Sequence, residues 1–231
     1  MGKFDQRRLV RKLDLERFIA KVESNPTPEA KLEQYTLSEP VAASILYLAA
    51  YTFDDIEGKN VLDLGCGTGR LALGAAFLGA ESVVGVDIDQ EVLKVAAKNS
   101  NLLGFKGRTS WIAGDIDSVA GNFDTVVQNP PFGVQTRTAD RKFIEKALES
   151  ANTVYSIHNH PFNDKQLLCR LKANGGQPMQ VEANSFLSRF INTRGGRVEA
   201  VYALPLTIPR MFDFHTKARH DIIIDLYVIR K

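Results

Sequence analysis

Short apolar runs rich in β-branched residues alternate with helical stretches through the middle of this chain, and this alternation limits the fold more than any other feature. The runs are NVLDLG, SVVGVD, SWIAGD, FDTVVQ and TVYSIH, and the clearest helical stretches between them span residues 69–79 and 90–103. Strands joined through helices form parallel sheets with helices packed on their faces. The sequence therefore predicts an α/β protein with a doubly wound sheet.

Two long apolar runs, EAVYALPLTI and DIIIDLYVIRK, end the chain without a helical stretch between them. They are expected to pair as an antiparallel hairpin at one end of the mostly parallel sheet. Helical segments at residues 4–23 and 38–51 precede the first strand. We expect residues 1–54 to pack as a helical segment on a single domain spanning residues 1–231. A parallel sheet closed by one reversed strand resembles the Rossmann-like class I methyltransferase fold.

Composition excludes several classes of protein. A net charge of +2 over 231 residues rules out nucleic-acid binding by bulk charge, so an RNA surface must come from local clustering. Cys66 and Cys169 form no metal-ligand spacing, so we expect no metal site and a reducing compartment. The first residues lack an apolar signal core, and residues 41–53 are too short to span a bilayer. We therefore expect a cytoplasmic protein that does not contact a membrane.

The stretch VLDLGCGTGR predicts a ligand-binding loop between the first strand and the following helix. Gly65, Gly67 and Gly69 allow the backbone to approach a ligand closely, and the N–H groups of the helix face it. Read from Gly67, the loop also fits a relaxed dinucleotide pattern, which leaves a nicotinamide-dependent oxidoreductase open. Asp63 favours S-adenosylmethionine, because a carboxylate repels a pyrophosphate and attracts ammonium and sulfonium groups.

Two further aspartates end the second and third strands, at the edge where open α/β sheets bind ligands. Asp87, in VVGVDID, can accept hydrogen bonds from both ribose hydroxyls of the cofactor, and Asp115, in AGDI, lies near the expected position of the adenine. The neighbouring Ile88 and Ile116 are expected to contact the cofactor as well. Either aspartate can instead cap the helix that follows it.

The motif NPPF ends the fourth strand and supplies the expected catalytic residues, Asn129, Pro130, Pro131 and Phe132. Consecutive prolines cannot donate to a sheet ladder, so the chain must leave the sheet in an extended form. The Asn129 side-chain oxygen and the Pro130 carbonyl are expected to hold both hydrogens of an exocyclic amine and to turn its lone pair toward the methyl donor. Phe132 is expected to stack on the base. The alternative is a proline-rich turn with Phe132 in the core.

Six stretches together resemble the methyltransferase-like protein 5 family of ribosomal-RNA adenine N6-methyltransferases: LEQY, DLGCGTG, VDID, FDTVVQNPPFG, YSIH and DFHTKARHDIIIDLY. The resemblance runs from about residue 32 to the end of the chain. It implies catalysis by residues 129–132 and a small zinc-binding activator protein that covers an apolar sheet edge. The cofactor contacts that it implies are Gln34, Gly65, Thr68, Arg70, Asp87 and Asp115.

Two departures from this family are visible. The family's Gln-Tyr-Pro-Thr is replaced by Gln34, Tyr35, Thr36 and a leucine, which moves the threonine. We still place Tyr35 and Thr36 in the expected cofactor site. The stretch at residues 165–186 is longer than its counterpart in the family.

The loop between the last two strands, PRMFDFHTKARH, mixes aromatic and basic residues. Phe214, His215 and Lys217 are expected to hold a splayed RNA strand by stacking and phosphate contacts. The alternative is a hairpin loop with solvated charges.

The expected function is S-adenosylmethionine-dependent N6-methylation of an adenine in RNA, with small-subunit ribosomal RNA as the substrate. A protein glutamine N5 or guanine N2 methyltransferase remains open, because these enzymes share the NPPF-type motif and act on a similarly poor amine nucleophile. A nicotinamide-dependent oxidoreductase and a cofactor-binding module without turnover are the more distant alternatives.

Overall fold

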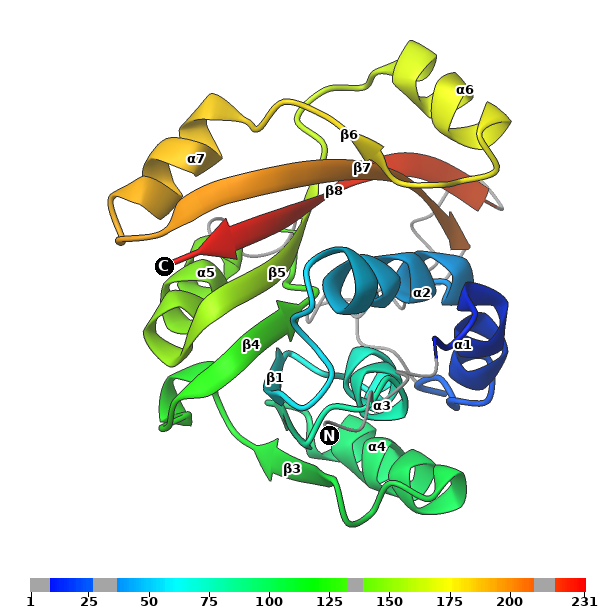
Figure 1. Ribbon diagram of the computed structural model, residues 1–231, viewed down its shortest axis with the longest axis vertical. Helices are drawn as coiled ribbons and strands as arrows, with labels where there is room; N and C mark the ends of the chain where they lie inside the picture. Colours follow the sequence, from blue (N-terminus) through cyan, green and yellow to red (C-terminus); the bar gives the residue numbers. More distant parts are fainter. Residues whose placement is uncertain (1–8, 27–36, 133–138, 210–218) are drawn as a thin grey trace, which may run out of the picture.

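A mixed β-sheet organises the chain (Figure 1). The computed structural model describes residues 9–26, 37–132, 139–209 and 219–231. Within these ranges the sheet has eight strands in the order β3-β2-β1-β4-β5-β8-β7-β6. The strands are β1 (Asn60–Leu64), β2 (Ser82–Asp87), β3 (Thr109–Ala113), β4 (Phe123–Gln128), β5 (Ala151–Asn159), β6 (Met179–Gln180), β7 (Arg197–Pro209) and β8 (Arg219–Arg230).

The direction of the strands confirms the predicted sheet. β1 to β5 pair in parallel, whereas β8 pairs antiparallel with both β5 and β7. The two C-terminal runs thus form the expected hairpin, and this hairpin adds a reversed strand beside β5. The fold is the class I methyltransferase fold.

Helices cover both faces of the sheet, as the alternation of strands and helices predicts (Figure 1). The helices are α1 (Lys12–Ile19), α2 (Glu39–Tyr47), α3 (Arg70–Phe77), α4 (Gln90–Leu103), α5 (Ala139–Ser150), α6 (Lys165–Ala173) and α7 (Ser185–Asn192). Side chains of α1, α2 and α3 share one buried cluster with Val127, and side chains of α5 and α7 share another with Val126. Successive strand residues point to opposite faces, so β4 contributes to both clusters.

The N-terminal helices pack against α3. Leu15 and Ile19 of α1 and Leu46 of α2 are fully buried, and the rings of Phe18 and Phe77 stack with centroids 4.1 Å apart. α1 ends earlier than the helix predicted over residues 4–23, because the chain tightens after Ile19 into turns with bonds between residues three apart. α2 continues as a π-helical turn, Leu48–Thr52, close to the predicted end at residue 51.

The stretch of residues 165–186 is ordered structure added to the sheet. It contains α6, the two-residue strand β6 that pairs with β7, and the beginning of α7. Leu167 and Leu171 of α6 pack on Ala203 and Ile223 in a third, smaller buried cluster. Burial of these apolar side chains fixes the added segment on β7 and β8. None of the helices in the described ranges has the length and apolar character needed to cross a membrane.

Asn99 of α4 joins the N-terminal segment to the loop after β1. Its side-chain oxygen accepts from the Glu23 N–H at 3.0 Å, and its amide nitrogen donates to the carbonyls of Glu23 and Thr68, both at 3.1 Å. Asn99 is 1% exposed, so the groups that it satisfies have little access to water. This buried amide therefore links the glycine loop to the chain after α1.

We predict that Asn99→Ala lowers the free energy of unfolding by about 2 kcal/mol, because the variant leaves buried backbone groups without a partner. Chemical denaturation of the purified variant measures this loss. Asn101→Ala is the matched control, since Asn101 is exposed on the same helix and its replacement is expected to change stability by less than about 0.5 kcal/mol. Equal stability of the two variants would contradict the bridging role of Asn99.

Candidate active site

β1 and β4 end side by side, and this pairing assembles the candidate site. Their parallel register sets Leu64 opposite Gln128. The residues that follow, Gly65 and Asn129, therefore leave the sheet at adjacent points. The end of the FDTVVQ strand thus lies beside the glycine loop, as the expected role of the NPPF motif requires.

The glycine loop is tied to β2 by backbone hydrogen bonds. Gly65, Gly67 and Gly69 have φ values of 70°, 53° and 83°, a region that favours glycine. The N–H groups of Gly65 and Cys66 both donate to the Val86 carbonyl, at 2.8 Å and 3.0 Å. The backbone path of the loop thus depends on glycine at three positions and on the neighbouring strand.

The three glycines have different surroundings. A Cβ atom at Gly69 would lie 2.5 Å from the Trp111 ring, and one at Gly65 would lie 3.0 Å from the Phe143 ring. At Gly67 no described atom comes within 4 Å of the same position. Protein side chains therefore approach the loop at two glycines, and Gly67 is the position where a ligand can come close.

Asp63 lies beneath this loop. It is 1% exposed, and its Oδ2 accepts from the Ala72 N–H in the first turn of α3 at 2.9 Å. Burial and, to a smaller extent, the charge of Asp87 raise the pKa of Asp63 to about 7, against the lowering effect of that hydrogen bond. A cation bound nearby would favour the ionised carboxylate, so Asp63 fits a cofactor that carries ammonium and sulfonium groups.

Asp87 holds the glycine loop from the end of β2. Its Oδ2 accepts from the Gly67 N–H at 2.8 Å, and its Oδ1 accepts from the Asp89 N–H at 3.0 Å. Burial raises the pKa of Asp87 as well. Each carboxylate oxygen keeps a lone pair for a further donor such as a ribose hydroxyl. The neighbouring Ile88 is 59% exposed, which leaves its side chain open to a ligand.

Asp115 caps the 3₁₀ turn Ile116–Ser118. Its Oδ1 accepts from the Asp117 N–H at 3.0 Å and from the Lys142 ammonium at 2.9 Å. These two hydrogen bonds lower the pKa of Asp115. Ile116 is 6% exposed and belongs to the buried cluster under α5 and α7. The capping alternative therefore describes Asp115 in this structure, and the cofactor role of Asp115 and Ile116 stays a proposal.

Arg70 links the start of α3 to the N-terminal segment beside the candidate site. Its guanidinium is buried and donates to the Leu37 carbonyl at 2.9 Å, to Glu39 at 3.0 Å and to Ser24 at 3.2 Å. The carbonyl of the adjacent Thr68 accepts from Asn99. The two terminal nitrogens of Arg70 and the Thr68 carbonyl are thus directed at protein partners, and the predicted cofactor contacts of both residues stay proposals.

The NPPF motif leaves β4 as the two prolines require. β4 ends at Gln128, Pro130 is buried, and Asn129 and Phe132 are half-buried. Phe132 packs against the cluster of α1, α2 and α3 and also lines a cavity. The ring therefore packs against the core, as the alternative interpretation predicts, and also leaves a surface on which a base can stack.

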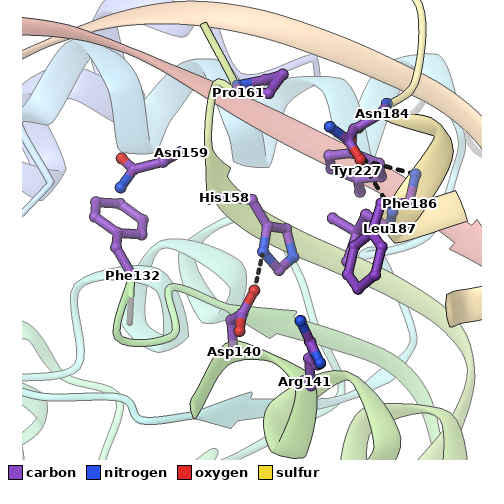
Figure 2. A pocket seen from close by; sticks show the side chains of 10 residues that line it. All are labelled: Phe132, Asp140, Arg141, His158, Asn159, Pro161, Asn184, Phe186, Leu187 and Tyr227. Carbon is purple, nitrogen blue, oxygen red and sulfur yellow. Dashed lines mark hydrogen bonds and ion pairs between the residues drawn. The ribbon is translucent and has the colours of Figure 1, made fainter. Parts of the chain in front are cut away.

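A cavity of about 320 Å³ opens beside Phe132 (Figure 2). His158 at the end of β5 forms its centre, Asp140 and Arg141 come from the start of α5, and Phe186 comes from the start of α7. These residues are far apart in sequence and are brought together by the pairing of β4 with β5 and by the added segment.

A buried polar chain connects this cavity with the end of β4. The Gln128 amide donates to the Ser156 hydroxyl at 2.8 Å, that hydroxyl lies 2.8 Å from the His158 Nε2, and the His158 Nδ1 lies 3.6 Å from Asp140. This series of polar contacts was not predicted from the sequence. The available signal was the spacing of Ser156 and His158, two positions apart and hence on one face of a strand.

Six expected site residues lie outside the described ranges. They are Gln34, Tyr35, Thr36, Phe214, His215 and Lys217.

Comparisons with known proteins agree with this geometry. The sequence profile of the methyltransferase small domain matches residues 42–168. The chain is 33% identical to the rRNA N6-adenosine-methyltransferase METTL5 of Danio rerio over 92% of this chain and 95% of that protein. It is 31% identical to the rRNA N6-adenosine-methyltransferase metl-5 of Caenorhabditis elegans over 88% of this chain and 90% of the relative.

A solved structure extends the similarity to the whole fold. A candidate RNA methyltransferase of Pyrococcus horikoshii, PH1948, is 34% identical to this chain and superposes with a TM-score of 0.79. The superposition covers 97% of this chain and 99% of the other.

We predict that Asp63→Asn makes the protein less sensitive to pH. A carboxyl group whose pKa is raised from 3.8 to about 7 on folding stabilises the fold below pH 4, and this contribution is lost as pH rises toward 7. The amide oxygen of asparagine can still accept from Ala72 but does not ionise. Between pH 5 and pH 8, the stability of the variant relative to wild type should rise by roughly 2–3 kcal/mol, measured by denaturation.

Glu81→Gln is the matched control, because Glu81 is exposed and lies at the opposite end of β2 from Asp87; this variant should reproduce the pH profile of wild type. The same variants test the cofactor role. Wild type should bind S-adenosylmethionine more tightly as pH rises from 6 to 8, since the cation favours ionised Asp63. Asp63→Asn should show no such rise in calorimetric titrations. Identical pH profiles for wild type and Asp63→Asn would contradict both statements.

Proposed function

The chain belongs to the METTL5 family of rRNA N6-adenosine methyltransferases, and from this premise we propose that it methylates the exocyclic N6 of an adenine in RNA, with small-subunit ribosomal RNA as its substrate. The single observation that carries the proposal is the register of β1 with β4. This register brings the NPPF motif next to the glycine loop, and such proximity supports a site in which the motif holds an amine against a methyl donor bound at the loop.

S-adenosylmethionine is the cofactor, and when bound it supplies an electrophilic methyl group on a sulfonium. The described residues fit it. Gly67 leaves room for close approach, Asp63 offers a buried carboxylate that a cation would ionise, and Asp87 keeps acceptor positions for hydroxyl groups. A pyrophosphate cofactor fits less well, because it would bring negative charge toward the buried Asp63 and the half-buried Asp87.

Asn129 and Pro130 hold the adenine amine. The lone pair of this amine is delocalised into the ring, so the amine is a poor nucleophile until its two hydrogens are held out of the plane that favours delocalisation. The Asn129 side-chain oxygen and the Pro130 carbonyl are the two acceptors, and the prolines limit the motion of that carbonyl. After methyl transfer the nitrogen is cationic and acidic, so its proton can leave to water without a strong base.

Phe132 sets the plane of the base. Its half-buried ring packs against the core on one side and faces the cavity on the other. Such a ring is held firmly while still offering a surface for stacking. We place Phe214, His215 and Lys217, which lie between β7 and β8 in the sequence and outside the described residues, on the RNA strand as the resemblance implies.

An activator protein is part of the same proposal. β3 is an edge strand of the sheet, and its Ile112 is 42% exposed. An apolar edge strand of this kind favours a covering partner, and a small zinc-binding activator is the partner that the family resemblance implies. We place the complex in the cytoplasm with its ribosomal RNA substrate.

The direct test is methylation of ribosomal RNA from cells that lack this protein. Purified protein, with its activator if required, is incubated with labelled S-adenosylmethionine and the RNA, and the nucleosides are separated. Label in N6-methyladenosine of the small subunit supports the proposal. Label in guanosine or in protein glutamine would instead favour the guanine N2 or glutamine N5 alternative and overturn the substrate assignment.

We predict that Asn129→Ala lowers the turnover number by about 10²–10³, because one of two acceptors for the reacting amine is lost. Cofactor affinity should change by less than about twofold, since the side chain acts on the amine. Single-turnover methylation and calorimetry measure the two quantities. Asn192→Ala is the matched control, because Asn192 is exposed on α7. Full activity of Asn129→Ala would refute the role assigned to Asn129.

A further inference from the structure

The cavity beside the NPPF motif does not contain the groups that hold the reacting amine (Figure 2). Phe132 lines it, whereas Asn129 and Pro130 do not. Its volume of about 320 Å³ is at the lower end of ligand pockets, which suits one planar ring system. The cavity thus adjoins the reacting centre through Phe132 and is separate from the amine-binding acceptors.

Two aromatic rings line the cavity from different parts of the chain. Figure 2 shows Phe132 on one side of His158 and Phe186 on the other. Phe186 is 58% exposed, although water around an aromatic ring is unfavourable. An exposed ring beside a cavity is typical of a stacking surface for a nucleobase.

The backbone around Phe186 is held in place. The Asn184 side chain accepts from the N–H groups of Phe186 and Leu187, at 2.9 Å and 3.1 Å. The Asn184 N–H donates to the Tyr227 hydroxyl on β8 at 3.0 Å. The exposed ring is therefore presented from a capped helix that is fixed to the sheet, which lowers the entropy lost when a ligand stacks on it.

Arg141 adds a cation at the same place. Its guanidinium carbon lies 4.8 Å from the centroid of the Phe186 ring and 5.8 Å from that of Phe190. Stacking uses the flat face of a guanidinium and leaves its in-plane N–H groups available for a phosphate oxygen. The cavity therefore has a stacking surface and a phosphate-binding group side by side.

Hydrogen-bonding groups complete the lining. Asp140 Oδ2 lies 3.6 Å from the His158 Nδ1, and despite burial this neighbouring imidazole lowers the pKa of Asp140. The ionised carboxylate can accept from the N–H groups of a base, and the Asn159 amide can both donate and accept. An apolar peptide side chain would leave these groups desolvated without partners.

We propose that this cavity binds the RNA base next to the target adenine, stacked on Phe186, with Arg141 on its phosphate, while Phe132 stacks on the target adenine itself. The proposal rests on the proposed function, because it assumes an RNA substrate whose target base leaves its strand. When that base unstacks, its neighbour loses a stacking partner, and a second aromatic site beside the first replaces it.

The test compares three proteins on RNA fragments that span the methylated site. The proteins are wild type, Phe186→Ala and the control Phe162→Ala, whose side chain is 73% exposed but does not line the cavity. The RNAs carry either the natural sequence or one abasic position directly before or after the target. RNA affinity is measured by fluorescence anisotropy, and methylation is measured as kcat and KM.

We expect Phe186→Ala to weaken binding of natural RNA and to raise KM about tenfold, with kcat nearly unchanged. Phe162→Ala should behave as wild type. One of the two abasic RNAs should show the same tenfold loss on wild type and no further loss on Phe186→Ala, because both changes remove the same stack.

Two results would overturn the inference. In the first, Phe186→Ala binds natural RNA as tightly as wild type. In the second, the losses from Phe186→Ala and from each abasic position simply multiply, which would show that Phe186 contacts something other than a neighbouring base. If Phe186→Ala instead impaired only activation by a protein partner, the cavity would belong to that interface.

Failure of the proposed function would look different. Wild-type protein would then leave adenosine in ribosomal RNA unmodified whatever the flanking base, and RNA binding would not depend on the target position.

Arg141→Gln tests the phosphate contact of the cavity independently. Loss of one phosphate contact should reduce the slope of log affinity against log salt concentration by about one.

Discussion

Parallel pairing of β1 with β4 is the constraint on which the candidate site depends. Because Leu64 lies opposite Gln128, the glycine loop and the NPPF motif begin at neighbouring points on the same edge of the sheet. A shift of one residue in either strand would move the amine-holding acceptors away from the loop and would turn the buried side chains of that strand to the wrong face. Packing of the buried clusters on the two faces of the sheet therefore stabilises the register of β1 with β4 on which the site depends.

Buried polar groups add a second level of support. Asp63 ties β1 to the first turn of α3, Asp87 ties β2 to Gly67, and Asn99 ties the glycine loop to the chain after α1. Two of these groups are carboxylates whose pKa values are raised by burial. The protein thus keeps negative charge under the loop at a cost that a cationic cofactor relieves, which links folding, protonation and cofactor binding.

The mostly parallel sheet and the C-terminal hairpin could be predicted from the sequence, because they depend on local alternation and on the regular geometry of parallel crossovers. The contacts of the loop could not. Trp111 and Phe143 reach Gly69 and Gly65 from later elements, and nothing near the glycines in sequence indicates these neighbours. The hydrogen-bond partners of Arg70 could not be predicted either, because they come from the N-terminal segment.

Residues 165–186 show most clearly which features the sequence pattern does not predict. Residues 165–186 have mixed polarity, so their sequence did not indicate where they would pack. Only tertiary structure brings Phe186 to the cavity that Phe132 lines. The polar chain from Gln128 to Asp140 has the same origin, because it joins β4, β5 and α5 across the sheet.

The most direct measurement is a crystal structure of the protein bound to adenosine that is joined through N6 to S-adenosylhomocysteine. We predict that N6 lies within hydrogen-bonding distance of the Asn129 side-chain oxygen or the Pro130 carbonyl, with the purine stacked on Phe132 and the sulfur beside Gly67. A complex in which the purine binds away from β4, or in which Asn129 is turned from N6 toward the protein core, would contradict it.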